Sequence, residues 1–228
     1  MTAEDWRARL RATPPSGWPA LLDAHSDLPG PRANLALVDA VAFEADDATI
    51  DVLLAGDDEF RTMCAAAALA RHADDAGHEA RARTLASDAR WRVREGVAIG
   101  LQHLGDASPR ALARIVRAWV DDAPLVQRAA VAAICEPRLL RTAEGAALAI
   151  EICHRATDQL VALTVDRRRQ DDARTLRQAL AYTWSVAVAA DPTHGLGAFL
   201  ALDVTDRDVA WIVAQNRRKK RLAGVLDG

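Results

Sequence analysis

The chain has 228 residues, of which 50% are hydrophobic and 27% are charged, with a formal net charge of −3 and an isoelectric point of about 6.1. This length fits one globular domain or one continuous array of repeats. The acidic balance argues against a bulk nucleic-acid binder, whose isoelectric point typically exceeds about 9, although a local basic patch would still bind phosphate.

The first 30 residues are expected to form a short capping segment. Residues 3–12 have the pattern of an amphipathic helix, and a Pro-rich turn follows them. Residues 20–26 have room for one or two further helical turns. The sequence Leu28–Pro31 predicts another turn, and its last proline is expected to occupy the first position of a helix over Arg32–Phe43.

A series of helices follows, separated by Asp, Gly and Pro residues that typically cap or end helices. The expected ranges are 48–55, 58–72, 77–87, 91–105, 109–120, 125–135, 142–154, 158–166, 172–189, 194–202 and 206–222. No alternating segment predicts a strand, and small apolar residues favour helix-on-helix packing. We therefore expect an all-α fold with more than about 65% helix.

Segments of the chain resemble one another at a regular interval. Val93 and Val126 occupy equivalent positions, 33 residues apart (126 − 93), and Leu69 and Leu101 are 32 residues apart (101 − 69). A period in the low thirties fits one helical hairpin with its turns, and such hairpins bury their apolar faces by stacking. Gly96 and Gly100 lie on one helix face, and at least one is expected at a close helix–helix contact.

The segment 88–101, D-x-x-W-x-V-R-x-x-V-A-x-G-L, resembles the second helix of a HEAT repeat. The chain is also similar to the bacterial HEAT-like group that includes the AlkC/AlkD-type DNA alkylation repair proteins, through residues 91–96, 126–130 and the basic close at 211–222. The similarity covers residues 50–222. It implies that residues 1–228 form a single α-solenoid domain of stacked HEAT-like helical hairpins.

The resemblance also implies a possible enzyme site. The similar glycosylases hold alkylated duplex DNA on a basic concave surface, with aromatic side chains and a carboxylate near the sugar. Asp121 is then the candidate catalytic carboxylate, and Arg128 a phosphate ligand. The aromatic candidates are Trp91, Trp119 and Trp184. The alternatives are that Asp121 and Asp122 cap the helix beginning near Pro124, and that Trp91 packs between repeats.

The strongest local charge signal is the run Arg217–Arg221, which predicts either a phosphate-backbone contact or a solvated helix end. Arg92 and Arg94 belong to a possible arginine ladder, which binds an extended anion or pairs with neighbouring aspartates. The full candidate set for nucleic-acid binding is Arg92, Arg94, Arg128, Asn216, Arg217, Arg218, Lys219, Lys220 and Arg221. A second run, Arg167–Arg169, is flanked by aspartates and predicts a neutralised, solvated face.

Other chemistry lacks a motif. The six histidines form no metal-ligand pattern, and no cofactor is expected. The cysteines at 64, 135 and 153 form no CxxC pair, so buried free thiols and a cytoplasmic location are expected. No apolar run approaches the ~18 residues that a membrane span requires. The sequence favours a non-enzymatic HEAT-repeat scaffold that binds a protein or the DNA backbone; the alternative is a DNA-binding protein or alkylated-base glycosylase.

Overall fold

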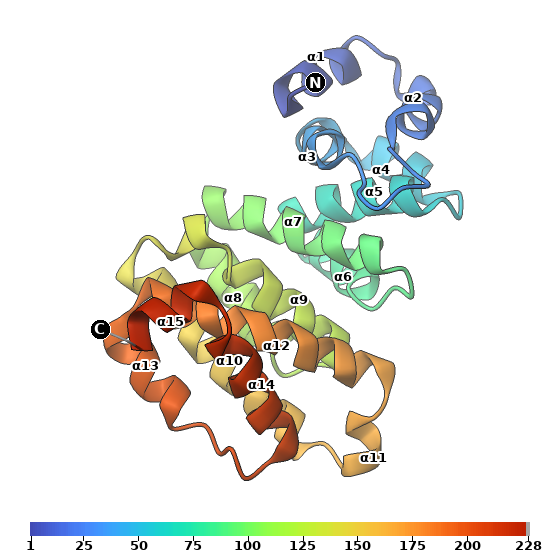
Figure 1. The fold of residues 1–228 in the computed structure, drawn as a ribbon. Helices are drawn as coiled ribbons and strands as arrows, with labels where there is room; N and C mark the ends of the chain where they lie inside the picture. Colours follow the sequence, from blue (N-terminus) through green and yellow to red (C-terminus); the bar gives the residue numbers. More distant parts are fainter. Residues whose placement is uncertain (227–228) are drawn as a thin grey trace. The chain divides into compact units, whose positions relative to one another are not determined.

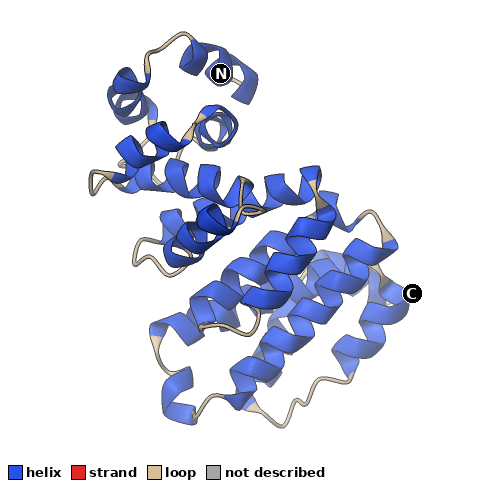
Figure 2. Cartoon of the chain, turned by 180° about the vertical axis from the view of Figure 1, so that it is seen from behind, coloured by secondary structure: helices blue, strands red, loops and turns tan. Residues whose placement is uncertain are grey.

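The computed structural model describes residues 1–226 and is all-α. Helices make up 77% of the residues, and the described part of the chain contains no strand (Figure 2), which confirms the predicted fold class at this level. The chain divides into two compact units, Met1–Ala107 and Ser108–Gly228, each of which has its own core. Within residues 1–226, no helix combines the length and apolar character that crossing a membrane demands.

The first unit is built around the helix α5, Glu59–Arg71 (Figure 1). Every residue from Thr62 to Ala70 is buried, because α5 packs against α2, α3, α4, α6 and α7. Asp58 caps α5 and Asp46 caps α4, so each of these helices begins directly after an aspartate. The other elements are α1 (Ala3–Arg11), a 3₁₀ turn (Pro15–Gly17), α2 (Trp18–His25), α3 (Leu35–Glu44), α4 (Asp47–Leu54), α6 (Ala76–Leu85) and α7 (Trp91–Ala107).

Two glycines of α7 lie directly against the backbone of α5. A Cβ atom on Gly96 would lie 2.3 Å from the carbonyl oxygen of Met63, and one on Gly100 would lie 2.2 Å from that of Ala67. The predicted close helix–helix contact at these glycines is confirmed. The run of small residues in α5 complements it, since larger side chains would hold the two helices apart.

The second unit is built around the helix α12, Asp171–Ala190, which packs against α9, α10, α13, α14 and α15. Trp184 of α12 is fully buried, with its ring 5.8 Å from that of Phe199. The other elements are α8 (Pro109–Trp119), α9 (Pro124–Ile134), a 3₁₀ turn (Pro137–Leu140), α10 (Ala143–Ala162), α11 (Val165–Arg168), α13 (Pro192–Leu200), α14 (Arg207–Arg217) and α15 (Lys220–Leu226).

Three predicted helix boundaries are wrong. The helix expected from Arg32 begins at Leu35, because the Asn34 side chain caps it by accepting from the Leu37 N–H. The helices expected over 142–154 and 158–166 are largely one helix, α10, since the residues between them include no helix breaker. The helix expected over 206–222 is interrupted at Lys219, whose N–H bonds instead to the Asn216 carbonyl at 2.9 Å.

Asp88, in the turn before α7, illustrates the carboxylates that stabilise the fold. Its oxygens accept from Nε and Nη2 of Arg90 at 2.9 and 2.8 Å, and from the Arg90 backbone N–H at 2.8 Å. The Arg90 guanidinium lowers the pKa of Asp88, against the opposing effect of partial burial. Arg117 and Arg167 lower the pKa of Glu151 and Asp172 in the same way.

We expect this protein to lose stability as pH falls through the acid range. A carboxyl whose folded pKa is lowered contributes stability above its unfolded pKa, about 3.9 for Asp, and that contribution disappears as pH falls through the folded pKa. The urea midpoint should therefore fall between pH 6 and pH 3, and less steeply in Asp88→Asn than in the parent. Equal slopes in the two proteins would show that Asp88 has no part in this dependence.

Candidate functional site

The candidate catalytic residue Asp121 lies in the turn after α8, with its side chain 51% exposed. It forms an ion pair with Arg155 and accepts from Nε2 of Gln159 at 3.3 Å. The capping alternative is wrong, because no side chain caps α9, whose N-cap is Ala123. Asp121 is therefore a surface carboxylate that links α8 to α10.

Two of the three aromatic candidates are core residues of the second unit. Trp119 and Trp184 are 0% exposed, and Nε1 of Trp184 donates to Oγ1 of Thr157 at 3.0 Å. Trp91 is 53% exposed but belongs to the first unit, where the Arg92 guanidinium lies 4.6 Å from its ring centroid. The predicted role of Trp119 and Trp184 at a lesion is corrected, because core rings that face other side chains are not available for a base.

The arginines expected to form a ladder already have partners. Arg92 donates to Glu59 at 3.0 Å and to the Gly30 carbonyl at 2.9 Å. Arg94 donates to the carbonyls of Asp88 and Ala89, at 2.6 and 2.8 Å. Arg128 is half-buried on α9 and also has an interaction partner. Arg92 and Arg94 are therefore engaged within the fold, but with a glutamate and backbone carbonyls rather than with the neighbouring aspartate side chains that the structural alternative expected.

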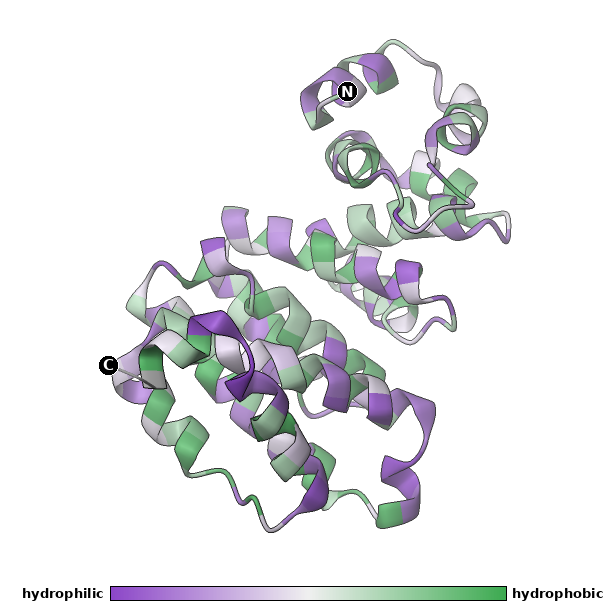
Figure 3. Cartoon of the chain, viewed as in Figure 1, coloured by the Kyte–Doolittle hydropathy of each residue, from purple (hydrophilic) through white to green (hydrophobic). Residues whose placement is uncertain are grey.

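The basic run is exposed apart from the half-buried Lys219, and two of its five cations lie against a tyrosine that sequence reasoning missed. Nη2 of Arg221 donates to the Tyr182 hydroxyl at 2.8 Å, and Cζ of Arg221 lies 4.9 Å from the ring centroid. Nζ of Lys219 lies 5.5 Å from the same centroid. We name Tyr182, Arg217, Arg218, Lys219, Lys220 and Arg221 the basic C-terminal cluster. The segment that carries its cations, from the end of α14 to the start of α15, is purple in Figure 3.

No carboxylate among residues 1–226 forms an ion pair with any of these five cations. Tyr182 is 46% exposed, so its ring forms part of the surface. The cluster is therefore a positive patch that its described surroundings leave uncompensated. Such a patch attracts anions, because no described carboxylate neutralises its positive charges.

Asn216, which immediately precedes the run, is a correction to the predicted set. Its side chain is fully buried and accepts from the Ser185 N–H at 2.8 Å. Its Nδ2 donates to the carbonyls of Leu180 and Ile212 at 2.9 and 2.8 Å. Asn216 therefore joins α14 to α12 and has no donor left for a phosphate.

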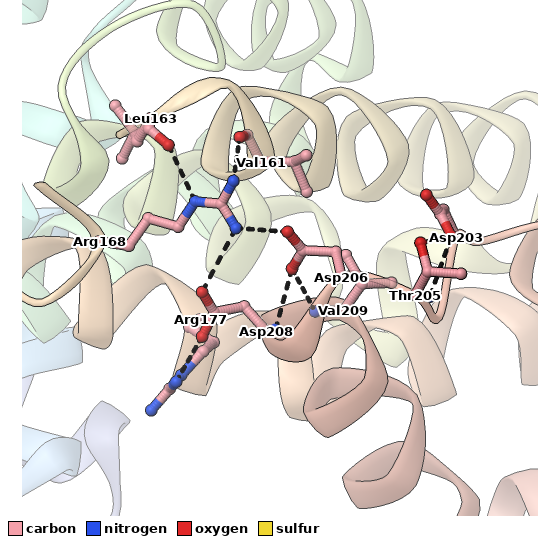
Figure 4. Close-up of polar contacts among 9 residues, drawn as sticks. All are labelled: Val161, Leu163, Arg168, Arg177, Asp203, Thr205, Asp206, Asp208 and Val209. Carbon is pink, nitrogen blue, oxygen red and sulfur yellow. Dashed lines mark hydrogen bonds and ion pairs between the residues drawn. The ribbon is translucent and has the colours of Figure 1, made fainter. Parts of the chain in front are cut away.

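A second basic feature lies elsewhere in this unit, between α11, α12 and α14. Arg168 was expected on a solvated face, but it is half-buried and pairs with Asp206 (Figure 4). Around it is a pocket of about 550 Å³ lined by Val165, Arg168, Arg169, Arg174, Arg177, Thr205, Asp206, Arg207, Asp208 and Trp211. We name it the arginine pocket. The sequence analysis identified only the run Arg167–Arg169 at this place, because the residues that line the pocket come from three separate segments.

The thiols are buried, and two of the histidines, His72 and His78, line a hollow of about 430 Å³ in the first unit. All three cysteines are buried and free, as predicted. Sγ of Cys135 lies 3.6 Å from Sγ of Cys153, and burial raises the pKa of Cys64. Within residues 1–226, no group of three or more His, Cys, Asp or Glu side chains is arranged to hold a metal ion.

Comparison of the chain with protein-family models, with curated proteins and with solved structures finds no match. The resemblance to the HEAT-like DNA repair group therefore stays a prediction, and function has to be argued from the site.

Proposed function

We propose that this chain is a non-enzymatic binding protein of HEAT-like helical hairpins, whose basic C-terminal cluster binds the phosphate backbone of a nucleic acid. The observation that carries the proposal is the run Arg217–Arg221, which has no carboxylate partner among residues 1–226 and of which Lys219 and Arg221 lie beside an exposed tyrosine.

The repeat part of the proposal is supported by four ion pairs, two in each unit, whose spacing along the chain is nearly the same. In these four pairs the partners are 33 or 34 residues apart, close to the period of the sequence matches, whereas other long-range arginine–carboxylate pairs span 30 to 38 residues. The four pairs are Arg90–Asp57, Arg92–Glu59, Arg117–Glu151 and Arg155–Asp121. Stacked helical hairpins bring equivalent positions together once per repeat, so the spacing favours an α-solenoid arrangement of each unit.

Binding is favoured over bond cleavage by the state of the candidate acid. Asp121 is exposed and paired with Arg155, and Trp119 beside it is buried in the core. Catalysis on an extruded base requires a pocket that stacks the base and excludes water. The surroundings of Asp121 provide neither feature.

Nucleic acid is favoured as the partner because of what the basic C-terminal cluster combines. Cations neutralise phosphates and release condensed counterions, and an exposed aromatic ring offers a stacking surface for a base. An acidic protein would use the cations alone. The net charge of −3 fits a nucleic-acid contact that is confined to this cluster, rather than an extended basic surface.

The test compares two double variants that change the net charge equally. Arg218→Glu/Lys219→Glu should weaken binding of labelled single-stranded and duplex DNA of any sequence, and should reduce the slope of log K against log salt by up to about 2, since each lost phosphate contact removes about 0.9. The control, Arg32→Glu/Arg110→Glu, reverses two exposed arginines that lie outside the cluster. Fluorescence anisotropy between about 50 and 200 mM salt measures both slopes.

Equal weakening by the control variant would overturn the proposed site, because the effect would then follow net charge alone. Absence of binding by the parent at about 50 mM salt would overturn the nucleic-acid partner. Release of an alkylated base by the parent protein, lost in Asp121→Asn, would overturn the non-enzymatic part. Circular dichroism verifies that each variant is folded.

A further inference from the structure

The arginine pocket has a surplus of positive charge that the proposed function does not use. Five arginines and two aspartates line its volume of about 550 Å³, together with Trp211. This volume is within the usual range for small-ligand sites, about 300–1,000 Å³. The pocket lies at the first turn of α14, whereas the cations of the basic C-terminal cluster begin at the last residue of this helix, Arg217.

The inner layer of the arginine pocket is fully engaged in structure. The Arg168 guanidinium donates to the Leu163 carbonyl at 2.9 Å, to the Val161 carbonyl and to Asp206 at 2.5 Å, and forms a longer contact with Asp208 (Figure 4). Asp206 also accepts from the backbone N–H groups of Asp208 and Val209. The two carboxylates of the pocket are thus turned toward Arg168 and the start of α14.

Arg177 also lines the pocket and contacts the inner layer through Asp208. Its Nη1 donates to Asp208 at 2.5 Å, and its guanidinium lies 4.6 Å from the ring centroid of Trp211. Its Nε is buried without a hydrogen-bond partner. Arg177 is therefore held rigidly by an acid and a ring, while its donors are only partly satisfied.

The outer layer consists of Arg169, Arg174 and Arg207, which are all exposed. Arg169 and Arg174 have only solvent-exposed partners, Asp166 at 2.9 Å and Asp171 at 3.8 Å. Exposed pairs of this kind contribute little, and a stronger anion displaces them readily. Arg207 forms no ion pair with any residue between 1 and 226.

We propose that the arginine pocket binds a polyphosphate group, which is a chain of two or more linked phosphates. Guanidinium groups match phosphate oxygens in bidentate geometry, and three of them around one hollow suit a multiply charged anion better than a single carboxylate. Asp206 and Asp208 do not oppose such a ligand strongly, because Arg168 and Arg177 neutralise them from the inner side. The proposal is independent of nucleic-acid binding.

Isothermal titration calorimetry with inorganic triphosphate tests the proposal. The parent should bind one triphosphate per chain at physiological salt, with a Kd tighter than about 1 mM, and more tightly than it binds inorganic monophosphate. Arg174→Gln/Arg207→Gln should weaken this binding about tenfold or more, because each lost charge-assisted contact contributes strongly. The matched control Arg217→Gln/Arg218→Gln removes the same charge from the basic C-terminal cluster and should leave triphosphate binding unchanged.

The proposal is overturned if the parent shows no saturable heat, or if both double variants lose binding equally. A parallel DNA titration separates the two proposals, since the control variant should lose DNA affinity while it keeps triphosphate. Titration of ATP beside triphosphate assigns the source of the group: equal affinities indicate a free polyphosphate, and tighter ATP binding indicates a nucleotide. Arg174 and Arg207 are exposed, so thermal melting should show both variants folded like the parent.

Discussion

Replacing Gly100 with Ala is expected to lower the stability of the first unit by about 3 kcal/mol, at the upper end of typical overpacking costs. The added Cβ would lie 2.2 Å from the Ala67 carbonyl oxygen and 2.7 Å from Cβ of Ala70. Both groups belong to the buried face of α5, so α7 has to move away from α5 along the whole contact. The urea unfolding midpoint of the full-length protein measures the loss.

The control for this prediction is Gly197→Ala in α13. Nothing lies within 4 Å of a Cβ at Gly197, and this glycine is exposed in the middle of its helix. Alanine there should stabilise the protein by about 0.5–1 kcal/mol, because glycine loses more backbone freedom on folding. A Gly100→Ala variant that is as stable as Gly197→Ala would contradict the close contact between α5 and α7.

Replacing Asn216 with Leu is expected to cost about 2–3 kcal/mol of stability. The substitution leaves the buried Ser185 N–H without its acceptor and removes the donor to the Leu180 carbonyl. Burial without a partner costs about 1–3 kcal/mol for each polar group, which exceeds the gain from the added apolar side chain. Chemical denaturation of Asn216→Leu and of its neighbour variant Gln215→Ala measures the difference, since Gln215 is only half-buried.

The same pair of variants distinguishes structure from binding. If Asn216 acts only as the link between α12 and α14, the folded fraction of Asn216→Leu should bind DNA with nearly parental affinity. A parental unfolding midpoint combined with weakened DNA binding would instead assign Asn216 to the phosphate contact, as the sequence alone suggested.

Local patterns in the sequence predicted local features of this protein well. Asp46 and Asp58 cap their helices, because capping depends on a few neighbouring residues. Gly96 and Gly100, four residues apart in a helix interior, were expected at a close contact and lie at one. The all-α class follows from the same short-range patterns of apolar residues.

The candidate sites depended on contacts that no local pattern reveals. Trp119 looked available to a base because an acid follows it, but its ring turned out to be buried. Tyr182 joins the basic run across an interval of 39 residues, and only the packing of α12 against α14 and α15 brings them together. The arginine pocket likewise needs three separate segments, so its charges could not be assigned to one surface from spacing.

The buried stretch Thr62–Ala70 limits how the first unit can change during evolution. A helix with a solvent face tolerates many substitutions there, but these positions of α5 have none. Exchange among alanine, serine, cysteine and glycine is the variation that its small positions, Cys64–Ala68, should accept. New recognition properties in residues 1–107 should therefore arise on the surrounding helices, while α5 stays nearly constant in volume across related chains.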